Sequence, residues 1–173
     1  MQLLTNANPL ALWQDVIKQA ENRCEVMLKQ ELEAYLATLL NRYTNQPELI
    51  KQTLAKGFLA AQQQTQHERQ FSLQVVGDQC LLFAGLFPAT AEKRLVSIGY
   101  FVEIGRSAYS SISSCANDLF QLLAMQFVVL MDVLQSIREY PDLLPLQAYD
   151  QWQEVGSLRA LRILRSYSKH NGI

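Results

Sequence analysis

The chain has 173 residues, of which 49% are hydrophobic, 18% charged and 9% aromatic. This composition excludes a disordered chain, which combines few apolar residues with a high net charge. It also excludes a Gly- or Pro-rich low-complexity chain. The formal net charge is -1, so no overall charge attracts nucleic acid or an anionic membrane. We expect one domain over 1–173, burying roughly 70% of the surface that its unfolded chain exposes.

The predicted elements follow one another as helices, because apolar residues recur at spacings of three and four and no alternating run predicts a strand. The expected helices cover about 9–20, 26–43, 47–61, 68–87, 90–114, 117–137 and 147–169. Whether the first two are one continuous helix or separate near Asn22 is left open by the pattern. The residues 1–7 and 170–173 are expected to fray. The predicted fold class is all-α, a single-domain bundle of six or seven helices.

Local signals support several of these boundaries. Asn8 followed by Pro9 is a typical helix start. Pro88 ends the helix before it, because a proline disfavours helical backbone at the preceding residue. Thr90 is expected to cap the following helix, and Pro141 and Pro145 are expected to form a short connector before the last one.

The most apolar stretch, residues 119–134, is interrupted by Gln121, Gln126 and Asp132. It falls short of the ~20 apolar residues that span a bilayer. The N-terminus has no Lys or Arg ahead of its apolar residues, as a secretory signal would. We therefore expect a buried helix and no membrane insertion.

The three cysteines, Cys24, Cys80 and Cys115, are widely spaced and form no Cys-x-x-Cys pair. Neither a disulfide framework nor a zinc site is indicated. Each lies in a helical, mostly apolar context, where a free cysteine behaves as a small hydrophobic residue. The expected location is the reducing cytoplasm.

Four glycines, Gly77, Gly85, Gly99 and Gly105, fall inside expected helices. Each costs ~1 kcal/mol relative to alanine there. The simpler explanation is close packing between helices. The alternative is a ligand lying against the bare backbone.

The polar cluster that most suggests a site consists of Tyr100, Glu103, Arg106 and Tyr109, which are spaced three residues apart. On a helix, each neighbouring pair is able to touch. The stripe is either a solvated or structural surface, or a candidate ligand-binding site.

A second cluster is basic. Arg159, Arg162, Arg165 and Lys169 are expected on one side of the last helix, opposite its apolar residues. The simpler interpretation is a solvated amphipathic face, and the alternative is a surface for an acidic partner or for nucleic acid. Four cations without interleaved aromatic residues are weak evidence for nucleic acid, which is the less favoured of these partners.

Standard catalytic and cofactor signals are missing from the sequence. His67 and His170 are its two histidines, and neither takes part in a spacing typical of di-iron, zinc or most haem sites. There is no phosphate-binding loop, Rossmann fingerprint or Gly-x-Ser-x-Gly elbow. No catalytic residue, metal or cofactor is predicted, and an enzyme is the less favoured class.

The segments 80–109 and 148–165 resemble a family of small all-helical bacterial proteins of unknown function. The similar features are the turn Glu33 to Leu36, the helix stop Gly85 to Pro88, the run Gly105 to Tyr109, and Tyr149, Trp152 and Gly156-Ser157. The resemblance implies a helical fold for residues 10 to 165. It brings no activity, cofactor or catalytic residue.

Two functions are predicted from these observations. The first is a non-enzymatic cytoplasmic interaction or regulatory protein that binds a protein partner or a second copy of itself. The alternative is a helical bundle that binds a small molecule near Tyr100, Glu103, Arg106 and Tyr109, with an enzyme as one form of it.

Overall fold

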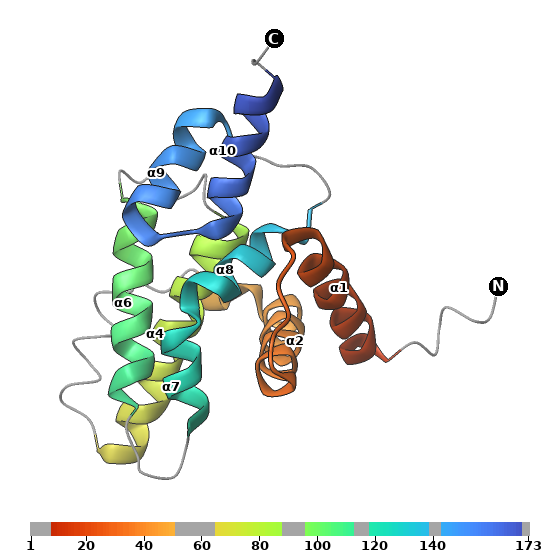
Figure 1. Cartoon of the computed structure of the whole chain (residues 1–173). Helices are drawn as coiled ribbons and strands as arrows, with labels where there is room; N and C mark the ends of the chain where they lie inside the picture. The colour runs from red at the N-terminus through yellow and green to blue at the C-terminus, as the bar shows by residue number, and fades with distance from the viewer. Residues whose placement is uncertain (1–7, 51–64, 88–95, 113–117, 139–142, 171–173) are drawn as a thin grey trace.

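The computed structural model of the chain describes residues 8–50, 65–87, 96–112, 118–138 and 143–170. Every regular element in these ranges is helical (Figure 1). They are α1 (Pro9–Cys24), α2 (Gln30–Asn45), the 3₁₀ turn η1 (Pro47–Ile50), α4 (Gln66–Leu86), α6 (Ile98–Ser111), α7 (Asp118–Met125), α8 (Phe127–Gln135), α9 (Pro145–Val155) and α10 (Leu158–His170). The all-α prediction is confirmed for the described residues.

The predicted count of six or seven helices is wrong, because the described ranges alone hold eight α-helices. The helix expected over 117–137 is divided at Gln126, whose φ of -98° and ψ of 12° depart from helical backbone. The one expected over 147–169 is divided at Gly156, whose φ of 71° is left-handed, a conformation that glycine adopts without steric cost. Thr90 and most of the helix expected over 47–61 lie outside the described residues, as do the tails 1–7 and 171–173.

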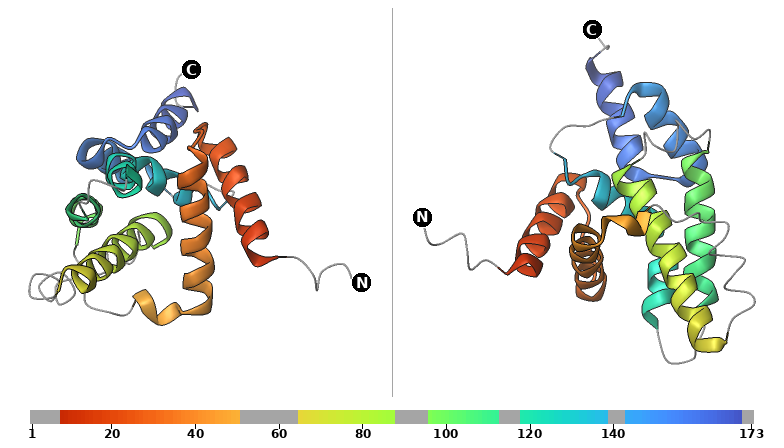
Figure 2. Two further views of the ribbon diagram at one scale, coloured as in Figure 1. Left: turned by 90° about the horizontal axis from the view of Figure 1, so that it is seen from below. Right: turned by 180° about the vertical axis from the view of Figure 1, so that it is seen from behind.

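Helices α4 and α6 run side by side and make the most extensive contact in the described structure. Helix α8 packs against α4, and the α1–α2 pair covers the other side of α7 and α8 (Figures 1 and 2). Helices α9 and α10 form a hairpin at one end of the described structure, where α9 contacts α6 and α10 contacts α8. In the right view of Figure 2, α1 and α2 lie on one side and α4 and α6 on the other.

One large buried cluster joins α1, α2, α4, α6, α7 and α8, and it includes the fully buried Phe83, Phe127 and Tyr109. A smaller cluster lies between α9 and α10, around Leu143, Ala148 and Ala160. The hairpin therefore has its own apolar contacts, and Val155 of α9 also packs against the large cluster.

Polar groups attach the hairpin as well, and Asp132, Gln135, Ser157 and Arg159 among them are buried. Ser157 Oγ, at the start of α10, donates to Asp132 Oδ1 of α8 at 2.6 Å and accepts from Ala160 N at 3.0 Å. Arg159 donates from Nη1 to Gln135 Oε1 of α8 at 2.8 Å. Arg162 donates to the carbonyl of Cys24 and lies 3.5 Å from Glu25 Oε2. These contacts fix α10 to α8 and to the end of α1.

Glycines allow the closest helix crossings, as the packing interpretation predicts. A Cβ atom on Gly105 would lie 2.5 Å from the ring of Phe127 and 2.9 Å from Cys80 Cβ. A Cβ on Gly77 would lie 2.5 Å from the ring of Tyr109, and one on Gly85 would lie 2.5 Å from Leu134 Cβ. These separations are far below van der Waals contact, so the small residue is required by neighbouring side chains.

Across the described ranges, no helix has both the length and the apolar character needed to cross a membrane.

Candidate functional site

A buried carboxylate lies where α2, α4 and α6 meet. Asp78 of α4 is 5% exposed, and its Oδ1 accepts hydrogen bonds from Tyr35 Oη of α2 at 2.5 Å and from Tyr109 Oη of α6 at 2.6 Å. Gln74 Nε2 donates to Tyr35 Oη at 3.2 Å. Gly77 precedes Asp78 and leaves the space that the Tyr109 ring occupies. One side chain thus connects three helices.

The second oxygen of Asp78 is less well satisfied. Its nearest cation is Arg42 Nη1, 3.5 Å from Oδ2, a distance longer than a good hydrogen bond. The Arg42 side chain is 40% exposed, so solvent weakens this pair. Oδ2 therefore has room for a further hydrogen-bond donor.

Burial raises the pKa of Asp78 to about 6, although both tyrosine hydroxyls and Arg42 act to lower it. Burial and the nearby carboxylate also raise the pKa of Tyr35 and of Tyr109. Both hydroxyls are therefore protonated donors at neutral pH, and Asp78 is an acceptor whose charge is only partly compensated.

Asp78 opens onto a cavity of about 310 Å³ between α2 and α4. Its walls are mainly apolar and its lining residues are Leu39, Arg42, Gln46, Phe71, Gln74, Val75, Asp78, Gln79 and Leu82. Phe71 stands at this cavity with 67% of its surface exposed. We call this cavity the Asp78 pocket. An apolar pocket of this size with a few convergent polar groups and a perturbed carboxyl pKa is the usual form of a small-molecule site.

The four residues of the predicted polar stripe do not share one face. Tyr109 is fully buried, whereas Tyr100 is 44% exposed and Glu103 and Arg106 face solvent. The reason is helical geometry, because nine residues make two and a half turns and place Tyr100 and Tyr109 on opposite sides. Tyr109 instead donates to Asp78 together with Tyr35, and we call these three buried residues the Asp78 cluster.

The other three stripe residues line an open groove between α6 and α9, with a volume of about 660 Å³. Glu154 of α9 lines it too, and Glu154 Oε2 would lie 3.0 Å from a Cβ atom on Gly99. Among the described residues, Glu103 forms no ion pair with Arg106.

The predicted basic cluster is also divided. Arg159 and Arg162 make the structural contacts that attach α10, and Arg159 is 9% exposed. Arg165 and Lys169 lie exposed on the last turns of α10. A single basic surface of four side chains is therefore not present.

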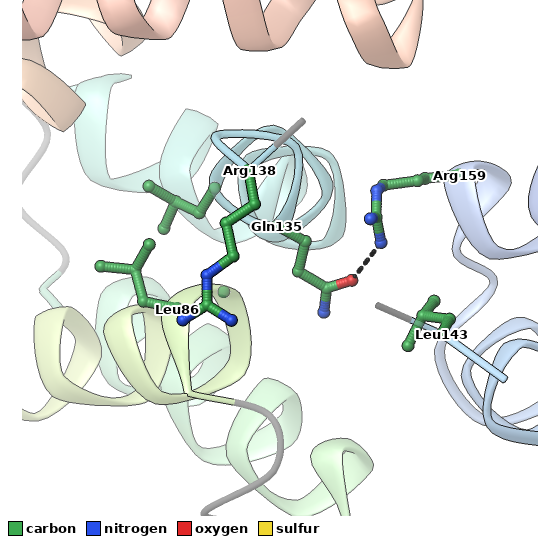
Figure 3. Close-up of a pocket in the computed structure, with 7 residues that line it drawn as sticks. Leu86, Gln135, Arg138, Leu143 and Arg159 are labelled. Atoms are coloured by element: carbon green, nitrogen blue, oxygen red, sulfur yellow. Dashed lines mark hydrogen bonds between the residues drawn. The ribbon is translucent and has the colours of Figure 1, made fainter. Parts of the chain in front are cut away.

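A third hollow lies beside Arg159. Figure 3 shows Arg159 pointing toward Gln135, with Arg138 and Leu86 on the other side. Its volume is about 20 Å³, which holds about one water molecule. This hollow is too small for an organic ligand.

Within the described ranges, no three His, Cys, Asp or Glu side chains gather as a metal site would require. Cys24 and Cys80 are free and buried, and burial raises the pKa of Cys80 to about 12. Neither thiol has the lowered pKa of a reactive cysteine.

The chain matches no protein-family model, no curated protein and no solved structure. The resemblance to a family of helical bacterial proteins stays an expectation.

The sequence prediction missed Asp78, Tyr35 and Arg42. One signal was present, because Asp78 is an isolated acidic residue within the apolar run from Val75 to Phe83. A carboxylate in such a run has to be paired when it is buried.

Proposed function

We propose that this protein binds a small, mainly apolar molecule in the Asp78 pocket, through a polar end that donates hydrogen bonds. The observation that carries this proposal is the incompletely satisfied Asp78 Oδ2 beside a cavity of about 310 Å³. A protonated amine is the strongest donor for such an oxygen, because a charge-assisted hydrogen bond is about twice as strong as a neutral one. Arg42 is the exposed partner that such a ligand would displace.

The preference for an amine over an acid follows from the two charges. The Asp78 carboxylate is fixed by two tyrosine hydroxyls, whereas Arg42 is exposed enough to turn toward solvent. Phe71, Leu39 and Leu82 supply apolar contacts for the rest of the molecule. The proposed activity is binding, and no reaction is assigned to the site.

Three probes with the same alkyl chain test the proposal. At pH 7.5, where Asp78 is ionised, hexylamine should bind more tightly than hexanol, and hexanol more tightly than hexanoate. Asp78→Asn should raise the Kd of hexylamine by about tenfold, which corresponds to about 1.4 kcal/mol. Hexylamine should then lose its advantage over hexanol. The variant keeps an oxygen acceptor for the tyrosines, and circular dichroism checks its fold. NMR titration measures the three affinities.

Phe71→Ala is the matched variant for the apolar wall. The exposed ring adds little to folding, so the variant should stay folded and bind all three probes several-fold more weakly. Met125→Ala, at an exposed position on α7 that does not line the pocket, should bind as the wild type does. Binding that favours hexanoate, or that ignores Phe71, would refute the proposal.

A second candidate function is self-association, and exposed apolar residues near the start of α9 favour it. Leu144 is 63% exposed, Leu146 is 77% exposed and Tyr149 is 45% exposed. Leu146 and Tyr149 are neighbours on one face of α9, being three residues apart. We propose that this surface contacts a second copy of the chain in the cytoplasm, a reducing compartment that suits the free thiols of Cys24 and Cys80.

Light scattering tests this second candidate. The wild-type protein should form dimers across the micromolar range, and Leu146→Ser should shift it toward the monomer. Leu12→Ser, at a similarly exposed position on α1, serves as the control and should leave the dimer intact. A wild-type protein that is strictly monomeric over this range argues against self-association.

A further inference from the structure

The Asp78 pocket contains both a carboxylate and a guanidinium. Among the described residues that line it, Asp78 and Arg42 carry the charges, one negative and one positive. They come from different helices, α4 and α2, and Arg42 Nη1 lies 3.5 Å from Asp78 Oδ2. The charges lining the pocket therefore cancel, and they lie side by side at one end of a mainly apolar cavity.

Both charges are accessible from the cavity. Arg42 lines the cavity and approaches Oδ2, whereas Oδ1 is covered by the hydroxyls of Tyr35 and Tyr109. Oδ2 is therefore the carboxylate oxygen on the cavity side. The Asp78 side chain keeps 8% of its surface exposed and the Arg42 side chain keeps 40%. Since 3.5 Å is longer than a good hydrogen bond, the pair is able to open around a ligand.

A simple amine would leave the guanidinium without a partner. Its ammonium group replaces Arg42 beside Oδ2, so that two cations lie close together and repel each other. A carboxylate next to the ammonium group removes this repulsion, because a guanidinium binds a carboxylate through two parallel hydrogen bonds. Gln46, four residues after Arg42, lines the same cavity, and its amide is a further donor.

Building on the amine-binding function proposed above, on which this inference rests, we propose that the Asp78 pocket binds an α-amino acid with an aliphatic side chain. The ammonium group donates to Asp78 Oδ2, and the carboxylate accepts from Arg42 and Gln46. The aliphatic side chain lies against Phe71 and Leu82, which line the apolar part of the cavity. A ligand with one charge of each sign matches a pocket with one charge of each sign.

The test compares norleucine with two probes that each lack one of its charged groups. Pentylamine is norleucine without the carboxylate, and hexanoate is norleucine without the amino group. By NMR titration of the full chain at pH 7.5, norleucine should bind about tenfold more tightly than pentylamine, because it forms a second charge-assisted contact. Hexanoate should bind most weakly of the three. Alanine, which lacks three methylene groups of norleucine, should bind at least about tenfold more weakly than norleucine.

Arg42→Gln tests the carboxylate contact. The ion pair that it removes is partly exposed and adds little to stability, so the melting temperature should change little. Norleucine should bind at least about tenfold more weakly, since its carboxylate then meets Asp78 and the negative end of α2 without a cation. Pentylamine should bind equally well or better, because a competing cation is gone. Arg69→Gln, at an exposed position on α4 that does not line the pocket, removes the same charge and should change neither affinity.

The outcomes distinguish this inference from the function on which it rests. If pentylamine binds and Asp78→Asn weakens it, but norleucine binds equally or more weakly, the amino-acid assignment is wrong and the amine-binding function stands. If Arg42→Gln weakens pentylamine as much as norleucine, Arg42 maintains the shape of the pocket and the assignment is also wrong. If none of the probes binds, both proposals are wrong.

Discussion

Tyr109→Ala should lower the free energy of unfolding by about 4 kcal/mol, the cost typical of removing a buried aromatic side chain. Tyr109 is fully buried against Gly77, so the substitution leaves a cavity that the glycine backbone cannot fill. It also removes one of the two hydroxyl donors of Asp78. Urea unfolding followed by circular dichroism measures the change.

Two further variants separate the contributions of the hydroxyl and of the buried ring to this loss of unfolding free energy. Tyr109→Phe removes the hydroxyl alone and should cost about 1–2 kcal/mol, the usual range for a lost buried hydrogen bond. Tyr100→Ala changes an exposed tyrosine on the same helix and should cost less than about 1 kcal/mol. If Tyr100→Ala and Tyr109→Ala cost the same, the two residues do not lie on opposite sides of α6.

The stability of the protein should increase as the pH falls from 7 toward 4. Burial raises the pKa of Asp78 and of Asp132 to about 6, from an ordinary value of 3.8. Between these pH values the folded protein binds more protons than the unfolded chain, so acid stabilises it. The stabilisation is complete below the unfolded pKa and is lost as the pH rises through about 6.

The expected effect is about 3 kcal/mol for each carboxyl group, because one pKa unit corresponds to about 1.4 kcal/mol. Exposed ion pairs such as Lys18–Glu33 weaken in acid and oppose the gain, by less than about 1 kcal/mol each. Urea midpoints from pH 4 to pH 8 measure the profile. Asp78→Asn combined with Asp132→Asn should flatten it, whereas a wild-type stability that declines steadily from pH 7 to pH 5 would contradict the assignment.

The helical class could be predicted from the sequence because apolar spacing reports one face of each helix. Breaks between helices were harder to predict. Gly156 is compatible with both a continuous helix and a left-handed end, and Gln126 carries no signal of the turn it forms. The number of helices was therefore underestimated.

The Asp78 cluster could not be predicted from the sequence for a different reason. Asp78 lies 43 residues from Tyr35 and 31 from Tyr109 along the chain. Spacings of three and four residues report neighbours within one helix, so they do not predict such pairings. The predicted stripe failed as a unit because steps of three residues drift around a helix. Arg159 and Arg162 similarly carry charge in the sequence, but their partners on α8 and α1 depend on how the hairpin docks.

Because Tyr35 and Tyr109 both donate to one oxygen of Asp78, neither α2 nor α6 can slide along α4 without breaking the hydrogen bond that it makes. The inner wall of the Asp78 pocket is consequently preorganised. The proposed ligand would have to order only the rotamers of Arg42 and Phe71 at the exposed rim, so little of its interaction energy would be lost to conformational entropy. We therefore expect the proposed ligand to bind without rearrangement of the helices.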